Sequence, residues 1–291
     1  MSTSVTSAVE PPELSTEDVA RLTERARFVR TETVRLIGIA KTGHYASTFS
    51  CAEIFAALYY SVLNLREGEP DWPGRDRLHL GKGHAAVGLY PLLADWGFFD
   101  PALLDSYTRL GNPLGDHPDM TQVPGVDFSS GSLGHALSTS LGAALAGRCT
   151  GQPYTVFALL GDGELHEGQI WEAAFSAAHH RVDNLIAIVD RNRYSLDGPV
   201  DDVIGLEPLA DKWRACNWDV REVDGHDVAV VTRLLHELKA RPAGCGPAVV
   251  IAHTVKGKGV EFMESENGWH LGWLDTEDEH DVYAELAGGL K

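Results

Sequence analysis

The sequence predicts an α/β protein built on a parallel β-sheet with helices on both faces. In the second half of the chain, short apolar segments alternate with longer segments of helical patterning. The apolar segments are continuous, as in YTVFALL at 154–160 and NLIAIVD at 184–190. A strand that is apolar on both faces is typical of a parallel sheet that is covered on both sides. Such sheets bind ligands beyond the carboxyl ends of their strands.

The N-terminal part of the chain is predicted to be mainly helical. Residues 1–14 lack the basic and apolar regions of a secretion signal, and we expect them to form a short disordered leader. A helix is expected from Ser15 to about Lys41, because STED at the start of this segment matches a capping box. A second helix is expected over SCAEIFAALYYSVL, capped by Ser50.

The next segments predict one strand and two helices. DRLHL at 76–80 is a short strand candidate that leads directly into GKGH. HAAVGLYPLLADWG predicts a helix that is stopped by Gly97. SLGHALSTSLGAALAGR at 132–148 predicts a helix whose many small residues suit close packing.

Strands and helices then alternate to the end of the sheet. After the strand at 154–160 we expect a helix from Glu164 to about Arg181, followed by the strand at 184–190. The remaining predicted elements are a helix at 206–217, a strand at 218–224, a helix at 226–241 and a strand at 247–254. No linker divides the chain, so we predict a single domain over 15–291, with a C-terminal extension after about residue 256.

Composition and charge exclude several classes of partner. The 291 residues are 44% apolar and 23% charged, which is ordinary for a globular enzyme. A formal net charge of −18 at pH 7 argues against nonspecific binding to nucleic acid or to anionic membranes. No apolar run has the length of a membrane span. We expect a cytoplasmic protein whose four cysteines, which lack C-x-x-C spacing, are buried free thiols.

Polar residues at two strand ends predict a cation site. Asp162, between Gly161 and Gly163, ends one strand, and Asn192 ends the next strand 30 residues later. Consecutive parallel strands are often neighbours, so both side chains can reach one point. Carboxylate and amide oxygens suit Mg²⁺, which often shares its shell with phosphates. The glycines let backbone N–H groups approach a phosphate, and the helix expected from Glu164 adds its positive end. Alone, GDG would commonly be only a turn.

These motifs and several others resemble the transketolase family. GDG followed about thirty residues later by asparagine is the thiamin-diphosphate motif, and GDGELHEGQIWEA and NLIAIVDRNRYSLDG are similar to transketolase in particular. The resemblance covers about residues 20–272 and includes DRLHLGKGHAAVGLYPLL, GNPLGDHPD, FSSGSLGHALSTSLGAALA, VKGKGVEF and NGWHLG. It implies a thiamin-diphosphate-binding fold. The implied reaction passes a two-carbon ketol unit from a ketose to an aldose.

The resemblance also implies a role for particular residues. Mg²⁺, with Ca²⁺ or Mn²⁺ as substitutes, would be held by Asp162, Asn192 and the carbonyl of Tyr194. The expected cofactor-binding residues are Lys82, His84, Gly131, Ser132, Leu133, Gly161, Asp162, Gly163, Glu164, Asn192, Tyr194, Lys256 and His270. His44, His84, His117 and His270 would face the substrate oxygens, where an imidazole can donate and accept protons. Glu167 would couple cofactor sites across an interface, and the other nine histidines, His166 among them, receive no role.

The resemblance implies a partner chain as well. A full-length transketolase carries a second domain whose glutamate protonates the aminopyrimidine of the cofactor, and this chain ends at Lys291, soon after the first domain. We therefore expect the N-terminal subunit of a split transketolase, inactive alone. Its partner would be a C-terminal subunit that carries the pyrimidine-binding domain, in an α2β2 assembly acting on small sugars or sugar phosphates.

The sequence departs from the family pattern at two positions, and several alternative functions remain open. Tyr45 follows His44 where the family has a small residue or proline, and His135 stands where glutamine is common. These departures concern the substrate more than the cofactor. The alternatives are an alpha-type subunit of a 2-oxo acid dehydrogenase, a deoxyxylulose-phosphate-synthase-like enzyme, and a noncatalytic regulatory subunit of the same fold. A generic nucleotide-binding domain is disfavoured, because neither of its glycine motifs is present. The donor and acceptor sugars are not predicted.

Overall fold

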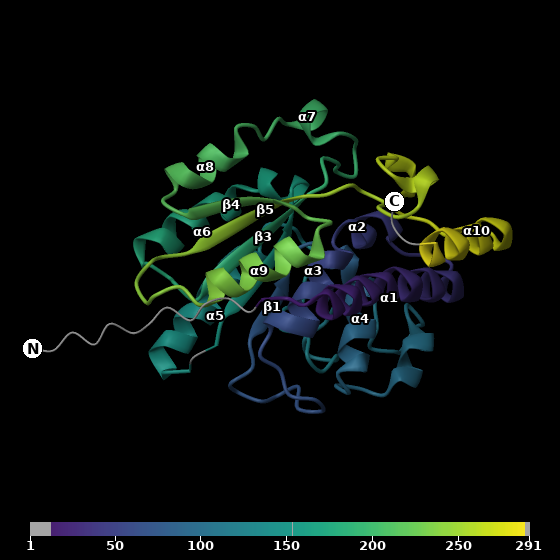
Figure 1. The fold of residues 1–291 in the computed structure, drawn as a ribbon, viewed down its shortest axis with the longest axis horizontal. Helices are drawn as coiled ribbons and strands as arrows, with labels where there is room; N and C mark the ends of the chain where they lie inside the picture. Colours follow the sequence, from purple (N-terminus) through teal and green to yellow (C-terminus); the bar gives the residue numbers. More distant parts are fainter. Residues whose placement is uncertain (1–12, 153, 289–291) are drawn as a thin grey trace, which may run out of the picture.

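A parallel β-sheet forms the centre of the structure (Figure 1). The computed structural model of the chain describes residues 13–152 and 154–288, so the expected leader at 1–14 lies almost wholly outside the described residues. Within these residues the sheet has five strands in the order β1-β2-β3-β5-β4, and neighbouring strands pair in parallel. The strands are β1 (Arg77–Leu80), β2 (Val156–Gly161), β3 (Leu185–Arg191), β4 (Asp219–Asp224) and β5 (Ala248–His253).

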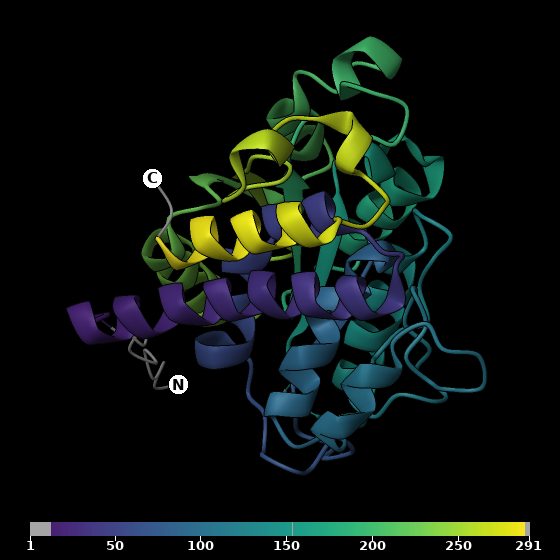
Figure 2. The ribbon, with the colours of Figure 1, turned by 90° about the vertical axis from the view of Figure 1, so that its right-hand side faces the viewer.

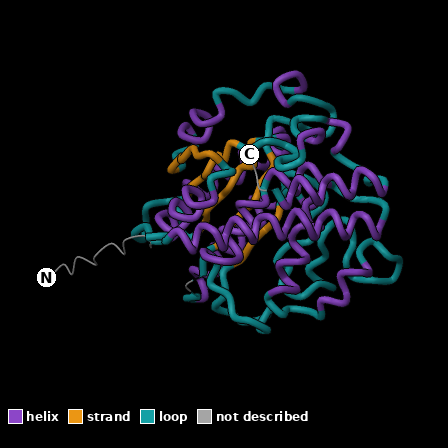
Figure 3. The backbone as a smooth tube through the Cα atoms, turned by 45° about the vertical axis from the view of Figure 1, so that its right-hand side comes forward, coloured by secondary structure: helices purple, strands orange, loops and turns teal. Residues whose placement is uncertain are grey.

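Helices cover both faces of this sheet, as predicted. Alternate residues of β2 point to opposite faces, so that Phe157 and Leu159 join one core while Val156, Ala158 and Leu160 join the other. The first core is completed by α1 (Thr16–Ala40), α3 (Ala52–Ala57), α4 (Ala86–Asp95), α9 (Val228–Lys239) and α10 (Thr276–Ala287). The second is completed by α5 (Ala136–Thr150), α6 (Gly168–His179) and α8 (Leu209–Ala215). Figure 3 shows the strands enclosed between these helices.

The N-terminal helix α1 confirms its predicted cap. The Ser15 hydroxyl accepts a hydrogen bond from the Asp18 backbone N–H (3.1 Å), and the Asp18 carboxylate accepts one from the Ser15 N–H (3.1 Å). This reciprocal pair satisfies two N–H groups that would otherwise lack partners at the helix start. The helix ends at Ala40, and the next residue, Lys41, caps it in a left-handed conformation with φ 55°.

The helix predicted over residues 50–63 is largely present, but its predicted cap at Ser50 is wrong. The chain forms α2 (Tyr45–Ser50), breaks at Cys51, and continues as α3 and a π-helical turn at Leu58–Val62. Ser50 is the last residue of α2, and its hydroxyl donates to the Asp190 carboxylate (2.6 Å) rather than capping a helix. The Ser50 hydroxyl therefore bonds a buried carboxylate on β3 and is not available to cap the next helix.

Three other helices begin or end at residues other than those expected. α6 begins at Gly168 rather than Glu164, because a 3₁₀ turn at Gly163–His166 precedes it, so its positive end lies beyond the GDG turn. α5 begins at Ala136, after Gly134 turns the chain with φ 86°. α8 is shorter than its predicted range, and an unpredicted short helix, α7 (Val200–Val203), precedes it. The remaining 3₁₀ turns are Gly83–Ala85, Pro101–Ser106, Glu261–Met263 and Asn267–Trp269.

The C-terminal segment returns across the first helices, and Figure 2 shows α10 running alongside α1. The Gly272 N–H donates to the Gly43 carbonyl (3.0 Å), and the Gly257 N–H donates to the Ala46 carbonyl (2.9 Å). These bonds hold the C-terminal segment beside the residue range 43–46.

Two sequence expectations can be compared directly with the described residues. Among them, no helix combines the length and the hydropathy that a bilayer span requires. All four cysteines are free, but only Cys51 and Cys216 are buried. Cys149 and Cys245 are exposed, so the expectation of four buried thiols is wrong for these two, which lie in segments at the ends of helices and strands.

Candidate functional site

A cavity of about 360 Å³ lies at the carboxyl ends of β2 and β3. The predicted site residues that line it are His44, Lys82, His84, His117, Gly131, Leu133, Gly161, Asp162, Gly163, Glu164, Glu167, Asn192, Tyr194, Lys256 and His270. Ser132 is exposed and is not among the lining residues. Lining residues that sequence reasoning did not select are Ser47, His166, Ser195, Leu196, Asp197 and Val203. Their roles stay predictions, but the structure brings nearly the whole predicted set together.

Sheet register places Asp162 and Asn192 on the same cavity. β2 and β3 pair in parallel with Gly161 opposite Asp190, and the Asp162 N–H donates to the Asp190 carbonyl (3.2 Å). Asp162 and Asn192 therefore follow two neighbouring strands at one edge of the sheet, and they are 1% and 6% exposed. Both are buried oxygen-bearing groups that border the cavity, which is the arrangement that the sequence predicted.

The Asp162 carboxylate is held by the chain around it. One oxygen accepts from the Gly163 N–H (2.7 Å), and the other accepts from the Arg193 N–H (2.6 Å) and from the Arg191 guanidinium (3.0 Å). Burial and the nearby charge of Asp190 raise the pKa of Asp162, and the Arg191 guanidinium opposes this rise. The carboxylate is thus fixed in direction before any ligand binds.

Arg191 is a site residue that sequence reasoning missed. Its side chain is buried and pairs with Asp162, with Asp201 (3.4 Å) and with Glu207 (3.2 Å). Arg191 therefore connects the cavity carboxylate to the segment that contains α7. The available signal was a charged residue inside the apolar run NLIAIVDRN, because a buried charge is paired in most proteins.

Lys82 does not bring an unpaired positive charge to the cavity. Its ammonium group pairs with the Asp190 carboxylate and donates to the Ser47 carbonyl (2.6 Å), and both charged side chains are almost fully buried. Burial lowers the pKa of Lys82, but the nearby acidic groups, Asp190 foremost, together outweigh burial and raise it. Lys82 was expected at the diphosphate and Asp190 had no expected role, so part of the expected local positive charge is already neutralised.

Lys256 is the less neutralised of the two lysines. Its ammonium donates to the Ser195 carbonyl (3.1 Å) and to the Asn267 side-chain oxygen (2.9 Å), neither of which carries charge. Burial, together with the Lys82 charge, lowers the pKa of Lys256 to about 8. A partly desolvated ammonium with neutral partners favours an anionic ligand.

The four predicted histidines form one cluster. The His44 ring centroid lies 5.2 Å from that of His84, 5.3 Å from that of His270 and 6.1 Å from that of His117. The His84 and His270 centroids are 5.4 Å apart. The four residues come from separate loops and turns, and the fold alone brings them together.

Burial keeps three of these imidazoles neutral. It lowers the pKa of His84 well below its usual value and lowers the pKa of His117, and burial with the nearby Lys256 charge lowers the pKa of His270 to about 3. Within the described residues, the buried His270 Nδ1 and Ser47 Oγ atoms have no hydrogen-bond partner. Unpaired buried polar atoms are costly, so this wall of the cavity fits a polar ligand.

Glu164 lines the cavity and also joins two loops. Its carboxylate accepts from the Gly134 N–H (3.0 Å) and the Gly161 N–H (3.1 Å), joining the loop before α5 to the end of β2. Burial raises the pKa of Glu164 to about 7, although the two N–H groups oppose this rise. A Cβ atom at Gly81 would lie 2.5 Å from the same carboxylate, so the glycine leaves room for it.

The rim of the cavity is partly apolar and exposed. Glu167 is exposed there as the residue that precedes α6. His166, which had received no role, lies 2.7 Å through Nε2 from the Ile204 carbonyl and so contacts the segment after α7. The exposed apolar side chains in these segments and after His270 are Leu196, Val203, Ile204, Leu271 and Trp273.

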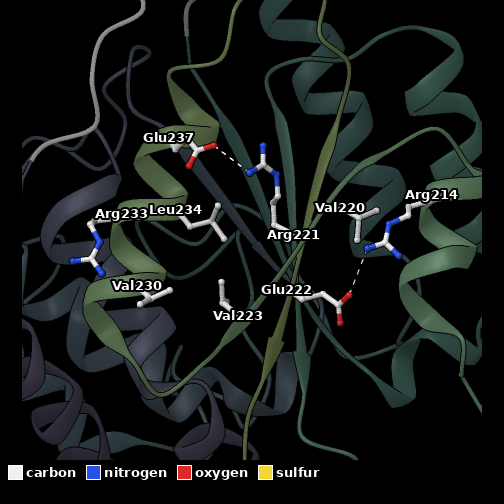
Figure 4. Close-up of a pocket in the computed structure, with 9 residues that line it drawn as sticks. All are labelled: Arg214, Val220, Arg221, Glu222, Val223, Val230, Arg233, Leu234 and Glu237. Carbon is white, nitrogen blue, oxygen red and sulfur yellow. Dashed lines mark ion pairs between the residues drawn. The ribbon is translucent and has the colours of Figure 1, made fainter.

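A second depression lies beside β4, the last strand of the sheet, and between β4 and α9. Figure 4 shows its lining residues. Arg221 pairs with Glu237 (3.2 Å), and Arg214 pairs with Glu222 (3.6 Å). Its charges are therefore largely matched to one another. The cavity at the strand ends, with its unpaired polar atoms, is the better candidate for a functional site.

The arrangement of residues around this cavity suits a domain that binds a diphosphate-bearing cofactor at the carboxyl ends of a parallel sheet. The family model described as transketolase, thiamine diphosphate binding domain, matches residues 21–286. The chain belongs to this family, and the resemblance read from the motifs is confirmed.

Relatives of two lengths match the chain. The 6-deoxy-6-sulfo-D-fructose transketolase subunit SqwG of Clostridium sp. (strain MSTE9) is 40% identical over 91% of this chain and 96% of its own length. An apulose-4-phosphate transketolase subunit of Phocaeicola vulgatus is 35% identical over 89% of this chain and 91% of its own length. A solved transketolase from Pichia stipitis superposes with a TM-score of 0.85 at 26% identity, over 92% of this chain and 41% of that chain. The chain thus spans about two fifths of that solved enzyme, and its length matches the two subunits.

Proposed function

We propose that the chain is the N-terminal subunit of a two-chain transketolase that transfers a two-carbon ketol unit from a ketose, such as a ketose phosphate, to an aldose. Residues 15–291 act in this proposal as one cofactor-binding domain. The observation that carries it is the single cavity that Asp162, Asn192, Lys256 and the four clustered histidines share. The near-complete match to two relatives that are named as transketolase subunits supports it.

The donor set fits a divalent cation with a diphosphate. Asp162, Asn192 and the Tyr194 carbonyl would hold Mg²⁺, for which Ca²⁺ or Mn²⁺ could substitute, because all three offer hard oxygen atoms. Lys256 would face the diphosphate oxygens, and Gly163, whose N–H is bonded to Asp162, would lie beside them. Bound thiamin diphosphate supplies a nucleophilic carbon that attacks carbonyl groups.

The histidines would move protons at the sugar oxygens. A neutral imidazole offers one donor and one acceptor, so His84, His117 and His270 can each donate to a carbonyl oxygen or accept from a hydroxyl near neutral pH. The unpaired His270 Nδ1 is available for such a bond. A noncatalytic regulatory subunit would not require this arrangement.

The partner in this proposal is a C-terminal subunit with the pyrimidine-binding domain, in an α2β2 assembly in the cytoplasm. Exposed apolar side chains on and beside the cavity lining support a protein partner there. Leu196 lines the cavity, and Ile204 and Trp273 lie one and three residues after the lining residues Val203 and His270; the three are 63%, 60% and 57% exposed. Glu167 lies at the same rim and would couple cofactor sites across the interface. No nucleic acid or membrane takes part.

Co-expression with a candidate partner chain tests the proposal. Each chain alone and the purified complex would be assayed with thiamin diphosphate and Mg²⁺ against ketose and aldose phosphates. The panel would also include 6-deoxy-6-sulfo-D-fructose and apulose 4-phosphate, the compounds in the names of two relatives. We expect ketol transfer only by the complex, and none by either chain on its own. Cofactor binding without any transfer would favour a regulatory subunit, and decarboxylation of 2-oxo acids would favour the dehydrogenase alternative.

A further inference from the structure

The loop that carries His117 is anchored to two buried tyrosines. The Tyr90 hydroxyl donates to the Gly115 carbonyl (2.8 Å), and the Tyr107 hydroxyl donates to the Asp116 carboxylate (2.8 Å). Leu114, just before this point, is fully buried. The Asp116 carboxylate therefore has a defined position, although its side chain is 30% exposed.

Asp116 stands between two of the four clustered imidazoles. Its Oδ1 lies 3.3 Å from His44 Nδ1, and its Oδ2 lies 3.7 Å from His117 Nδ1. Burial raises the pKa of Asp116, but the bonds from His44 and Tyr107 outweigh burial and lower it. Asp116 is consequently ionised at neutral pH and can only accept hydrogen bonds.

This contact decides which nitrogen of His44 carries the proton. A carboxylate accepts, so the facing Nδ1 must donate, and the neutral His44 ring then has its lone pair on Nε2. The same logic governs any histidine whose tautomer is set by the bond to its other nitrogen. In this chain the loop reads GDHPD, so Asp116 directly precedes His117.

We propose that Asp116 is a positioning residue that fixes the Nδ1–H tautomer of His44 and so makes Nε2 the proton acceptor in the substrate cavity. This rests on the proposed function and deepens it, because it assigns His44 an accepting role toward a sugar hydroxyl. The charged or titratable groups around His44 are Asp116 and Tyr107 from the loop side and His84, His117 and His270 from the cavity side.

Nuclear magnetic resonance of the full chain tests the tautomer directly. Long-range ¹H–¹⁵N spectra distinguish Nδ1–H from Nε2–H imidazoles, and a His44→Gln variant assigns the His44 signals. In the wild type we expect Nδ1–H for His44. In Asp116→Asn the amide can present either its oxygen or its NH₂ group to Nδ1, so the Nδ1–H tautomer is no longer required and the Nε2–H population should rise. An unchanged His44 tautomer in Asp116→Asn would overturn the proposal.

Two further variants separate this effect from loosening of the loop. Tyr107→Phe removes one bond to the Asp116 carboxylate but keeps the carboxylate, so His44 should remain Nδ1–H. Asp119→Asn alters an exposed carboxylate of the same loop whose bonds go to Thr121, Gln122 and Ser129, so the His44 spectrum should not change. A change of tautomer in Asp119→Asn as large as in Asp116→Asn would show that loop structure is responsible, which contradicts the proposal.

Activity of the reconstituted complex gives the second measurement. Asp116→Asn should bind thiamin diphosphate normally and lower kcat/KM by about tenfold to hundredfold. Normal kcat/KM would refute the accepting role of His44. Should the wild-type complex transfer no ketol unit, the proposed function would fail, while the spectra would still decide the tautomer.

Discussion

Arg191 and Asp162 form a buried ion pair at the end of β3, with 3.0 Å between the guanidinium Nη1 and the carboxylate Oδ2. The same guanidinium reaches Asp201 and Glu207, so one side chain connects the cavity carboxylate to the segment around α7. Removing one member of a buried pair leaves the other charge without compensation.

Arg191→Met should therefore lower the free energy of unfolding by about 3–5 kcal/mol, measured by urea denaturation. Arg193→Met is the matched control, because the Arg193 side chain is exposed and only its backbone N–H bonds Asp162. We expect that variant to stay within about 0.5 kcal/mol of the wild type. Equal stability of the two variants would contradict the structural role of the pair.

Asp162→Ala should abolish Mg²⁺-dependent binding of thiamin diphosphate to the reconstituted complex. The carboxylate is the one charged group in the proposed cation site, and its loss removes the main attraction for the ion. Titration calorimetry with and without EDTA would show the change. Asp201→Ala removes an exposed carboxylate from the same Arg191 network and should keep metal-dependent binding. Normal binding by Asp162→Ala would show that the site assignment is wrong.

Glu164 should make the chain without cofactor less stable as pH rises from about 4.5 to about 7, which spans its usual pKa and its pKa in the folded protein. In this range the folded state still holds the proton that the unfolded chain has lost, so deprotonation favours unfolding. The slope is at most about 1.4 kcal/mol per pH unit.

The difference in unfolding free energy between Glu164→Gln and the wild type isolates this group. The unfolding free energy of Glu164→Gln minus that of the wild type should increase as pH rises from about 4.5 to about 7, and should then become constant. Urea denaturation at a series of pH values measures it, with Glu172→Gln as an exposed control. A difference independent of pH would contradict the raised pKa of Glu164.

Lys256→Met should raise the pKa of His270. Burial is the main cause of the low pKa of this imidazole, and the Lys256 charge lowers it further. Without that charge the pKa should rise yet stay below 6.5, which histidine titration by nuclear magnetic resonance can follow. Lys258→Met is the control, because the Lys258 ammonium pairs with Glu264 (3.2 Å). A similar rise in both variants would contradict the proposed Lys256 effect.

The apolar rim should contribute to binding of the partner subunit. Leu196→Ser and Ile204→Ser each remove an exposed apolar side chain, whose full burial in an interface is worth about 1.5–3 kcal/mol. Each change should weaken association by about tenfold to hundredfold in a titration of the two purified chains. Ile39→Ser, on α1, should leave the affinity unchanged. Unaltered affinity in both rim variants would place the interface elsewhere.

The prediction of the sheet from sequence succeeded for a local reason. A strand buried on both faces needs a continuous apolar run, and β3 is buried along its whole length. Because parallel strands end at one edge, Asp162 and Asn192 could be placed together from their positions after two such runs. The Ser15 cap was also predictable, since its partner Asp18 lies within the same turn.

Prediction was poorer where a bond partner lies far away in the sequence. Ser50 was expected to cap a helix, but its hydroxyl bonds Asp190 on a strand 140 residues later. Glu164 was expected to begin α6, but its carboxylate bonds the Gly134 N–H in another loop. In both cases a distant buried group competes successfully with a local pattern.

The sequence by itself therefore determined the layers of this protein, the family to which it belongs, and the strand ends where its oxygen donors stand. Only the tertiary structure decided that Lys82 is neutralised by Asp190, that Arg191 restrains Asp162, and that Asp116 faces His44. The physical reason is that the apolar pattern of a strand or helix depends on a few consecutive residues. The partner of a buried charge, by contrast, is whichever group the fold brings beside it, and that group can lie far away in the sequence.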